Sequence, residues 1–485
     1  MDHRRFLPID HKWRENKSFN GIVERRSPPK KLSGVEILAQ VKDLEGMKFG
    51  KRVKLPKRDD NWKKKSIFFE LPYWSTLLLR HNLDVMHIEK NVCDNILGTL
   101  LDIEGKSKDN IKARHDFKRV KIMKHLAPKL MNGKWHIPPA PYTLSRTQKE
   151  KVCKFLECIK VPDGYSSNIS KCINLDKRKI WGLKTHDCHV LMEQLLPLAI
   201  WGVSLPKVYE VIVKMSTFFR DLCSKILKVK DLDTLERQIS ITLCEMEKIF
   251  LPSFFDVMVH LCVHLATEAK LGGPVQYRWM YPIERLLRKL KCYVRNKSRP
   301  EGSIAEGYII EECMLFCSKY LHDIETRFNQ PDRNTDEEDN DYQGLSIFAP
   351  IGIPLGKAKL RSLTKEELTQ VREYVLKNCD EAQEYLNEYE DGTFDKNLVD
   401  WFRDRVMDLL GEGHDDQVVK DLRTFALGPL EGVKCFNGYV GNGFRFHTKE
   451  TERKRVNQNS GVMVKGIVGA REDDYFGILT DIIEA

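Results

Sequence analysis

The chain has 485 residues, of which 41% are hydrophobic and 31% charged, and its formal net charge is +10. This composition is typical of a folded protein with two or three domains. The sequence contains no run of 18 apolar residues and no apolar signal core at its start, so we expect neither a membrane span nor a secretory signal. Its thirteen cysteines include no CxxC pair, which indicates reduced intracellular thiols rather than a disulfide framework.

The positive charge is concentrated at the start of the chain. Residues 1–65 contain 19 Lys and Arg against 9 Asp and Glu, a net of +10, whereas the remaining residues contain 61 of each kind. This excess predicts contact with a polyanion, and in residues 48–65 basic side chains surround Trp62, which can stack on a base. The same charge also fits a solvated, partly disordered arm, or a nuclear import signal. The residues that we expect to contact nucleic acid are Lys51, Arg52, Lys54, Lys57, Arg58, Lys63, Lys64 and Lys65.

The sequence becomes apolar after residue 66, which marks entry into a folded core. Residues 77–83 predict a buried strand, and a helix is expected from about residue 88 to 101. Asp84 and His87 lie between the two. Polar side chains at strand ends commonly build sites in α/β folds, but Asp84 can equally cap the helix, and both interpretations stay open.

The middle of the chain predicts a mainly helical block. Apolar residues recur with helical periodicity in residues 208–227, 232–250 and 252–271, and we expect helices over most of residues 88–328. Ahead of these helices, His186 and His189 form an HxxH motif. It could bind a metal ion, or its polar side chains could cap a helix and satisfy buried backbone groups.

A second pair of histidines lies within the third periodic segment. His260 and His264 are four residues apart, so on a helix they share one face and could hold one metal ion. A buried helix with two satisfied histidines is the more common outcome for such a pattern. Glu284 then opens the next predicted helix and is followed by basic residues, among them Arg285 and Arg288. A carboxylate beside cations suits an enzyme that binds metal and a polyanionic substrate.

The last third of the chain changes from helical to β character. Residues 327–344 are acidic and polar, and we expect a linker at 331–356, a small helical unit at 357–411 and a β-rich unit at 412–485. Short strands are expected at 433–440, 444–448, 461–468 and 475–483. With a basic arm at 1–65 and a helical domain at 66–330, the sequence therefore predicts five parts.

Five stretches of sequence carry a resemblance to a known family. They are MDHRRFLP at 1–8, LDVMHIEKNVCDNILGTLL at 83–101, LKTHDCHVLMEQLLP at 183–197, the long segment that runs from HLCVHL to EEC at 260–313, and NGFRFHTKETERKRVNQNSGVMV at 442–464. Together they resemble the transposases of plant CACTA (En/Spm-type) DNA transposons, in the order of that family.

The resemblance implies a fold and a chemistry. Such transposases resemble RNase H-fold enzymes with a large all-helical insertion, so the expected fold class is mainly α with α+β character, an RNase H-like remnant and a small C-terminal β unit. Their DDE chemistry uses two Asp and one Glu around Mg²⁺ or Mn²⁺, and a Cys pair with a His pair binds zinc. The resemblance places the third carboxylate at Glu284, the His pair at His260 and His264, and an Asp-x-x-His element near the catalytic core at Asp84 and His87. The expected catalytic residues are therefore Glu284 and Asp84.

The resemblance also implies that the first two catalytic Asp and a CxxC precede the MDHRRFLP stretch. We therefore expect a fragment of a DDE-type cut-and-paste transposase, or a host protein derived from one, that does not catalyse alone. The expected location is the nucleus, and the expected partners are DNA at transposon ends and full-length transposase or a second copy. The alternative is a non-catalytic DNA-binding or protein-interaction module.

Overall fold

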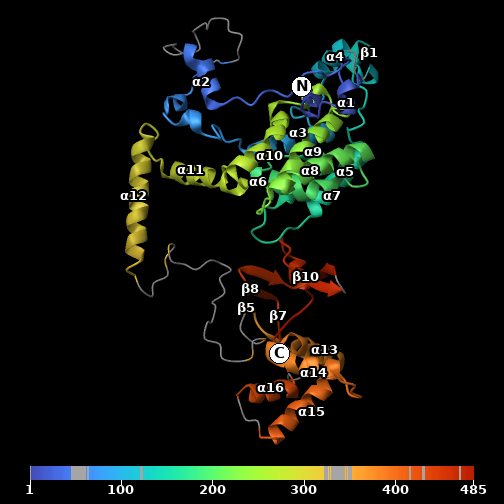
Figure 1. Ribbon diagram of the computed structural model, residues 1–485, viewed down its shortest axis with the longest axis vertical. Helices are drawn as coiled ribbons and strands as arrows, with labels where there is room; N and C mark the ends of the chain where they lie inside the picture. The colour runs from blue at the N-terminus through green and yellow to red at the C-terminus, as the bar shows by residue number, and fades with distance from the viewer. Residues whose placement is uncertain are drawn as a thin grey trace. The chain divides into compact units, whose positions relative to one another are not determined.

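The computed structural model divides into two compact units (Figure 1), residues 1–159 with 169–309 and residues 160–168 with 310–485. It describes residues 2–44, 62, 65–120, 124–321, 326, 328, 345, 347, 352–413, 417–428, 432–468 and 471–484. In the described ranges, none of the helices combines the length and apolar character needed to cross a bilayer.

The first unit is built from helices with two small hairpins. A 3₁₀ turn, His3–Phe6, precedes the first helix, and a π-helical turn, Leu191–Leu195, joins α6 to α7. The hairpins are β1 (Lys129–Met131) with β2 (Lys134–His136) and β3 (Ile173–Asn174) with β4 (Lys179–Ile180). The helices are α1 (Lys12–Glu15), α2 (Gly34–Val41), α3 (Val85–Leu100), α4 (Ile111–Val120), α5 (Arg146–Cys158), α6 (Thr185–Val190), α7 (Leu196–Ile200), α8 (Pro206–Leu222), α9 (Val229–Glu247), α10 (Val257–Gly272), α11 (Tyr281–Tyr293) and α12 (Pro300–Ser318), the last of which continues into the second unit.

The core of this unit lies where α10 packs against α3 and α9 while α8 packs against α9 (Figure 1). On α8 the buried residues Val208, Val211, Met215, Phe219 and Leu222 are spaced three or four apart, so one face of the helix is apolar. The helices predicted from periodicity at 208–227, 232–250 and 252–271 correspond to α8, α9 and α10.

The strand predicted at residues 77–83 is wrong. After a 3₁₀ turn at Trp74–Thr76 these residues form no regular structure, and the side chain of Leu78 is 73% exposed. In the described part of the chain none of the sheets includes this segment. A strand without a neighbour leaves its backbone N–H and C=O groups unpaired, so an apolar run without a partner strand does not stay extended.

The second unit combines three antiparallel sheets with helices. One sheet has the order β5 (Gly352–Leu355), β8 (Gly438–Gly441), β9 (Phe444–His447), and a second has the order β12 (Ile482–Glu484), β7 (Gly432–Phe436), β6 (Lys359–Ser362). The third is the hairpin β10 (Gly461–Val468) with β11 (Arg471–Ile478). β5 and β6 were not predicted, and both pair with strands of the C-terminal β region. The three segments that the sequence separates, 331–356, 357–411 and 412–485, therefore share sheets.

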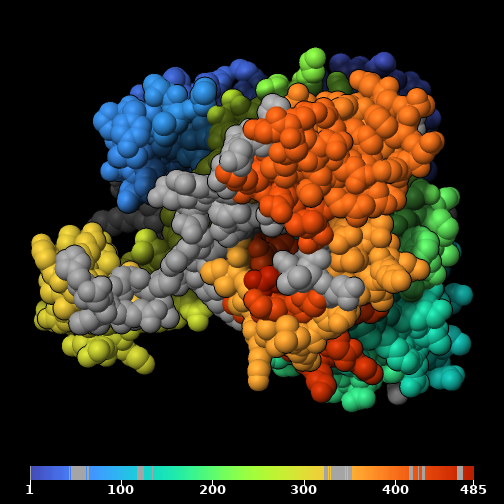
Figure 2. All heavy atoms as spheres, turned by 90° about the horizontal axis from the view of Figure 1, so that it is seen from below, coloured from blue at the N-terminus to red at the C-terminus, as the bar shows by residue number. Residues whose placement is uncertain are grey.

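The helices of the second unit have a core of their own. They are α13 (Lys365–Asn378), α14 (Gln383–Asp391), α15 (Leu398–Gly411), α16 (Gln417–Leu427) and the short α17 (Lys449–Glu452). Leu376, Trp401, Phe402 and Leu422 pack together among the buried residues of α13, α15 and α16. In Figure 2 the helices α13, α14, α15 and α16, in orange, form one closely packed body.

Candidate functional site

Four side chains that can ligate a metal ion meet inside the helical unit. They are Glu89 of α3, His189 of α6, Glu193 of the π-helical turn and Cys223, which caps α8. One ligand atom from each lies within 4.8 Å of all the others. Within the described residues they are the one group of three or more such side chains that meets this limit, and we call them the Glu89 cluster.

Local structure explains how the four side chains converge. Glu89 lies on the face of α3 that buries Val85, Val92 and Ile96, and α3 packs against α6. His189 and Glu193 are four residues apart across the start of the π-helical turn, so both face the same way. A π-helical turn inserts an extra residue into a helix and often occurs at functional sites.

The contacts in the cluster are short and buried. His189 Nδ1 lies 2.6 Å from Glu89 Oε2 and 3.4 Å from Glu193 Oε1. The Glu89 side chain is only 2% exposed, and in the described structure its Oε1 is buried without a hydrogen-bond partner. A buried carboxylate oxygen of this kind is costly and calls for a physical explanation.

Burial disfavours the charged form of every member of the cluster. It raises the pKa of Glu89 well above its ordinary value, and burial with the nearby Glu89 charge raises the pKa of Glu193 to about 7. Burial, followed by the charges of Glu89 and Glu193, raises the pKa of the Cys223 thiol. Burial also lowers the pKa of His189. Without a cation, the four groups are therefore driven toward neutrality.

Aromatic side chains flank the cluster on the side of α11. The ring of Trp279 lies edge-on to His189, with centroids 6.0 Å apart, and Tyr281 lies 4.9 Å from Trp279 and 5.8 Å from His186. The Tyr281 hydroxyl is buried and has no hydrogen-bond partner in the described part of the chain. Burial and then the charge of Glu89 raise its pKa, and Asp84 contributes to the same shift.

Asp84 and Glu284, the two predicted catalytic carboxylates, lie in different environments. Asp84 occupies the N-cap position of α3, but its side chain makes no capping hydrogen bond, and its Oδ1 is buried without a partner in the described structure. His87 is exposed. Glu284 lies in the first turn of α11 and is exposed, and the strand that was predicted to end beside Asp84 is not formed.

His260 and His264 lie on the same side of α10, with ring centroids 5.4 Å apart. They face the N-terminal segment: His260 Nδ1 lies 3.2 Å from His3 Nε2, and the ring of Phe6 contacts both histidines. His3 Nδ1 in turn lies 2.7 Å from Glu247 Oε1. Among the residues that the structure describes, this pair belongs to no group of three or more ligating side chains within the 4.8 Å limit.

The predicted nucleic-acid contacts at Lys51, Arg52, Lys54, Lys57, Arg58, Lys63 and Lys64 lie outside the described residues, and only Lys65, which is partly exposed, lies within them. Residues 2–44 of the same N-terminal arm are described and contain the helices α1 and α2. Arg4 and Arg14 are buried, and their guanidinium groups donate to backbone carbonyls, Arg4 to Asn16 and Arg14 to Leu7. Part of the N-terminal positive charge therefore lies on buried side chains that bind backbone carbonyls of the same segment.

A second basic segment is fully described. Residues 285–299 contain seven Lys and Arg and no Asp or Glu. α11, which carries the first four of these cations, has no buried residue and leads away from the helical core (Figure 1). The cations are Arg285, Arg288, Lys289, Lys291, Arg295, Lys297 and Arg299, and all are exposed. We call residues 285–299 the basic segment.

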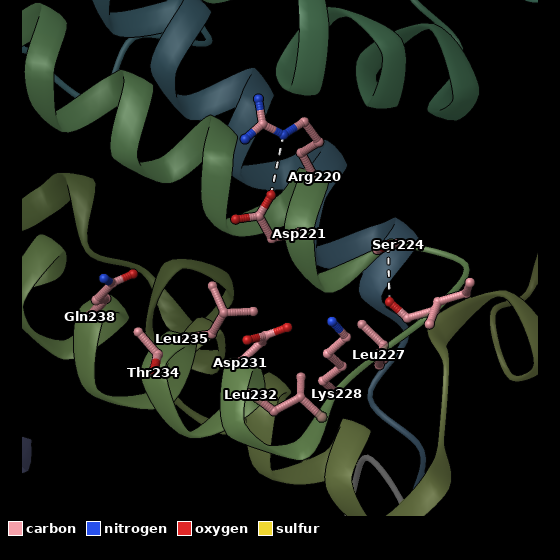
Figure 3. Close-up of a pocket in the computed structure, with 11 residues that line it drawn as sticks. Arg220, Asp221, Ser224, Leu227, Lys228, Asp231, Leu232, Thr234, Leu235 and Gln238 are labelled. Carbon is pink, nitrogen blue, oxygen red and sulfur yellow. Dashed lines mark hydrogen bonds and ion pairs between the residues drawn. The ribbon is translucent and has the colours of Figure 1, made fainter. Parts of the chain in front are cut away.

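A pocket of about 710 Å³ opens between the end of α8 and the start of α9 (Figure 3). Arg220 pairs with Asp221 at 3.2 Å, and the Ser224 hydroxyl donates to the carbonyl of Ile226. These interactions join neighbours on the pocket's own rim, so these side chains do not converge on a common point in the pocket. We therefore place the candidate chemistry at the Glu89 cluster.

Two protein-family models match parts of this chain. Residues 1–44 match the model of transposase family tnp2, and residues 222–335 match a domain of unknown function, DUF4218. The chain is related to transposases. No curated protein and no solved structure was found to match it.

The tnp2 match and the DUF4218 match meet in the fold of this transposase-related chain. The matched N-terminal residues His3 and Phe6 pack on His260 and His264, which lie in the other matched range. Glu89, His189 and Glu193 lie outside both ranges, and Cys223 lies at the start of the second. Of the four residues in the Glu89 cluster, only His189 was predicted from the sequence as a candidate ligand. No local spacing in the sequence connects side chains from four separate elements.

Proposed function

We propose that this chain is the DNA-binding part of a cut-and-paste transposase of the CACTA (En/Spm) type, acting in a plant nucleus on transposon ends. The match to transposase family tnp2 supports the general relationship, and the five family-like stretches support the type. In this proposal the helical unit is the insertion of an RNase H-like, DDE-type enzyme. The observation that supports the DNA-binding role is the exposed basic segment, because seven exposed Lys and Arg with no Asp or Glu in the same 15 residues favour binding of phosphate groups.

The test replaces two cations of α11 and measures the salt dependence of DNA binding. Arg285→Gln with Arg288→Gln should lower affinity for duplex DNA about 10- to 100-fold near 0.1 M salt, and should flatten the slope of log K against log salt by about 1.8. The matched control is Lys207→Gln with Lys230→Gln, which removes the same charge from exposed positions on α8 and α9. Equal losses in both pairs would show a general charge effect and would remove α11 as the interface.

We further propose that these 485 residues do not cleave or join DNA by themselves. Two-metal chemistry needs carboxylates on both ions, whereas Glu284 is exposed and Asp84 lies at a helix start rather than at a strand end. Incubation of the purified chain with supercoiled transposon-end DNA and Mg²⁺ or Mn²⁺ should leave the DNA intact. Metal-dependent nicking that disappears in Asp84→Asn or Glu284→Gln would contradict this and would assign catalysis to those carboxylates.

A second candidate function is a protein-interaction module. It is favoured by α12, where apolar side chains lie exposed along the helix, among them Ile309, Ile310, Met314 and Phe316. Exposed apolar surface of this extent commonly marks a protein-binding site. A chain whose DNA affinity is unaffected by salt and by the α11 substitutions would favour this second function over the first.

A further inference from the structure

We propose that Glu89, His189, Glu193 and Cys223 bind one transition-metal ion of the Zn²⁺ class inside the helical unit. The ion would join α3, the α6 segment with its π-helical turn, and the end of α8. This site is independent of the DNA-binding role proposed above and uses none of its residues.

The geometry is close to that of a tetrahedral site. Zn²⁺ bonds of about 2.0–2.3 Å to O, N and S place neighbouring ligand atoms roughly 3.3–3.8 Å apart. The four ligand atoms here lie within 4.8 Å of one another, and His189 Nδ1 is 3.4 Å from Glu193 Oε1. Its 2.6 Å contact with Glu89 Oε2 is a hydrogen-bond distance, which must lengthen if both atoms bind one ion. In this proposal, rotation of the side chains between rotamers brings the four atoms to these separations.

The chemistry of the four groups selects the ion. An imidazole, a thiol and two carboxylates form a mixed N, S and O set, which suits Zn²⁺ or Co²⁺, whereas Mg²⁺ and Ca²⁺ prefer oxygen alone. The four elements that supply them fix the separation of the ligands, and the ring of Trp279 packs against His189. A ligand set held on helices in this way is pre-organised for an ion.

The unpaired oxygen of Glu89 is the observation that points to a ligand. The side chain is nine-tenths or more buried, and its Oε1 has no hydrogen-bond partner in the described structure. Two buried carboxylates beside a thiol make an unfavourable group unless a cation compensates them. A divalent ion supplies that compensation and gives one of the two carboxylate oxygens of Glu89 a partner. A network of neutral, protonated side chains is the alternative, and it leaves Oε1 unexplained.

The experiment titrates the purified 485-residue chain, stripped of metal by chelator, with Co²⁺ and then with Zn²⁺. We expect one Co²⁺ per chain, visible d–d bands with a thiolate-to-cobalt band in the near ultraviolet, and displacement of Co²⁺ by Zn²⁺. Cys223→Ser should abolish the near-ultraviolet band, and His189→Gln should weaken binding at least 100-fold. Helical content by circular dichroism shows that each variant is folded.

Two matched variants keep the test specific. Cys172→Ser removes another half-buried cysteine of the same unit, and His186→Gln removes the neighbouring histidine, which is outside the cluster. Both should bind Co²⁺ as the parent chain does. The proposal is overturned if the parent chain binds no stoichiometric metal, or if folded Cys223→Ser keeps the full spectrum, which would place the ion at another site such as His260 and His264. DNA affinity, measured separately, reports on the proposed function alone.

Discussion

Replacing Arg114 with methionine should lower the free energy of unfolding of the helical unit by about 3–5 kcal/mol. Arg114 is 1% exposed, and its Nε and Nη2 donate to the two oxygens of Asp109 at 2.5 and 2.6 Å. Its Nη1 donates to the carbonyl of Leu126 at 2.7 Å. Methionine fills much of the volume but leaves a nearly buried carboxylate without a cation and a carbonyl without a donor, and both are costly. Urea unfolding followed by tryptophan fluorescence measures the loss.

Two further variants separate the ion pair from simple packing. Tyr142→Phe removes only the hydroxyl that donates to Asp109 at 2.8 Å, so it should cost about 0.5–1.5 kcal/mol. Adding Asp109→Leu to Arg114→Met removes the unpaired carboxylate and should recover part of the lost stability. If Arg114→Met costs no more than Tyr142→Phe, the buried pair does not stabilise this unit as we describe.

The fold was predictable from the sequence where apolar residues repeat over several turns. The segments that became α8, α9 and α10 carry six or more buried residues each, and a long periodic signal specifies a helix whatever its neighbours are. The strand predicted for the apolar run at 77–83 was wrong because a strand depends on a partner strand that its own sequence does not encode. β5 was missed for the converse reason, since its partner β8 lies some 80 residues further along the chain.

The candidate site was less predictable than the fold. His189 was visible through the HxxH spacing, but Glu89 and Cys223 look like ordinary residues of amphipathic helices. Their convergence depends on how α3, α6 and α8 pack together, and a single sequence contains no short-range signal for such packing. The same limit applies to the N-terminal segment: a count of charges could not distinguish Arg4 and Arg14, which are buried and hydrogen-bonded, from cations that are free to bind DNA.

The interaction between the N-terminal segment and α10 should make the helical unit sensitive to acid through His260. Burial, and then the neighbouring His3 and His264, lowers the pKa of His260 from 6.5 to about 4. The unfolded chain therefore takes up a proton at this residue at higher pH than the folded chain does. Its contribution to stability is fully present above pH 6.5 and is lost as the pH falls from 6.5 toward 4.

His260→Gln should remove this acid sensitivity. Between pH 7 and pH 4.5 the parent chain should lose about 2–3 kcal/mol more stability than the variant, since each unit of pKa difference corresponds to about 1.4 kcal/mol. Urea midpoints at half-unit pH steps measure the difference, and groups that titrate in both proteins cancel. His87→Gln, at an exposed position, should follow the parent curve. Parallel curves for the parent and His260→Gln would show that His260 titrates alike in the folded and unfolded chains. The packing of the N-terminal segment on α10 would then not lower the pKa of His260.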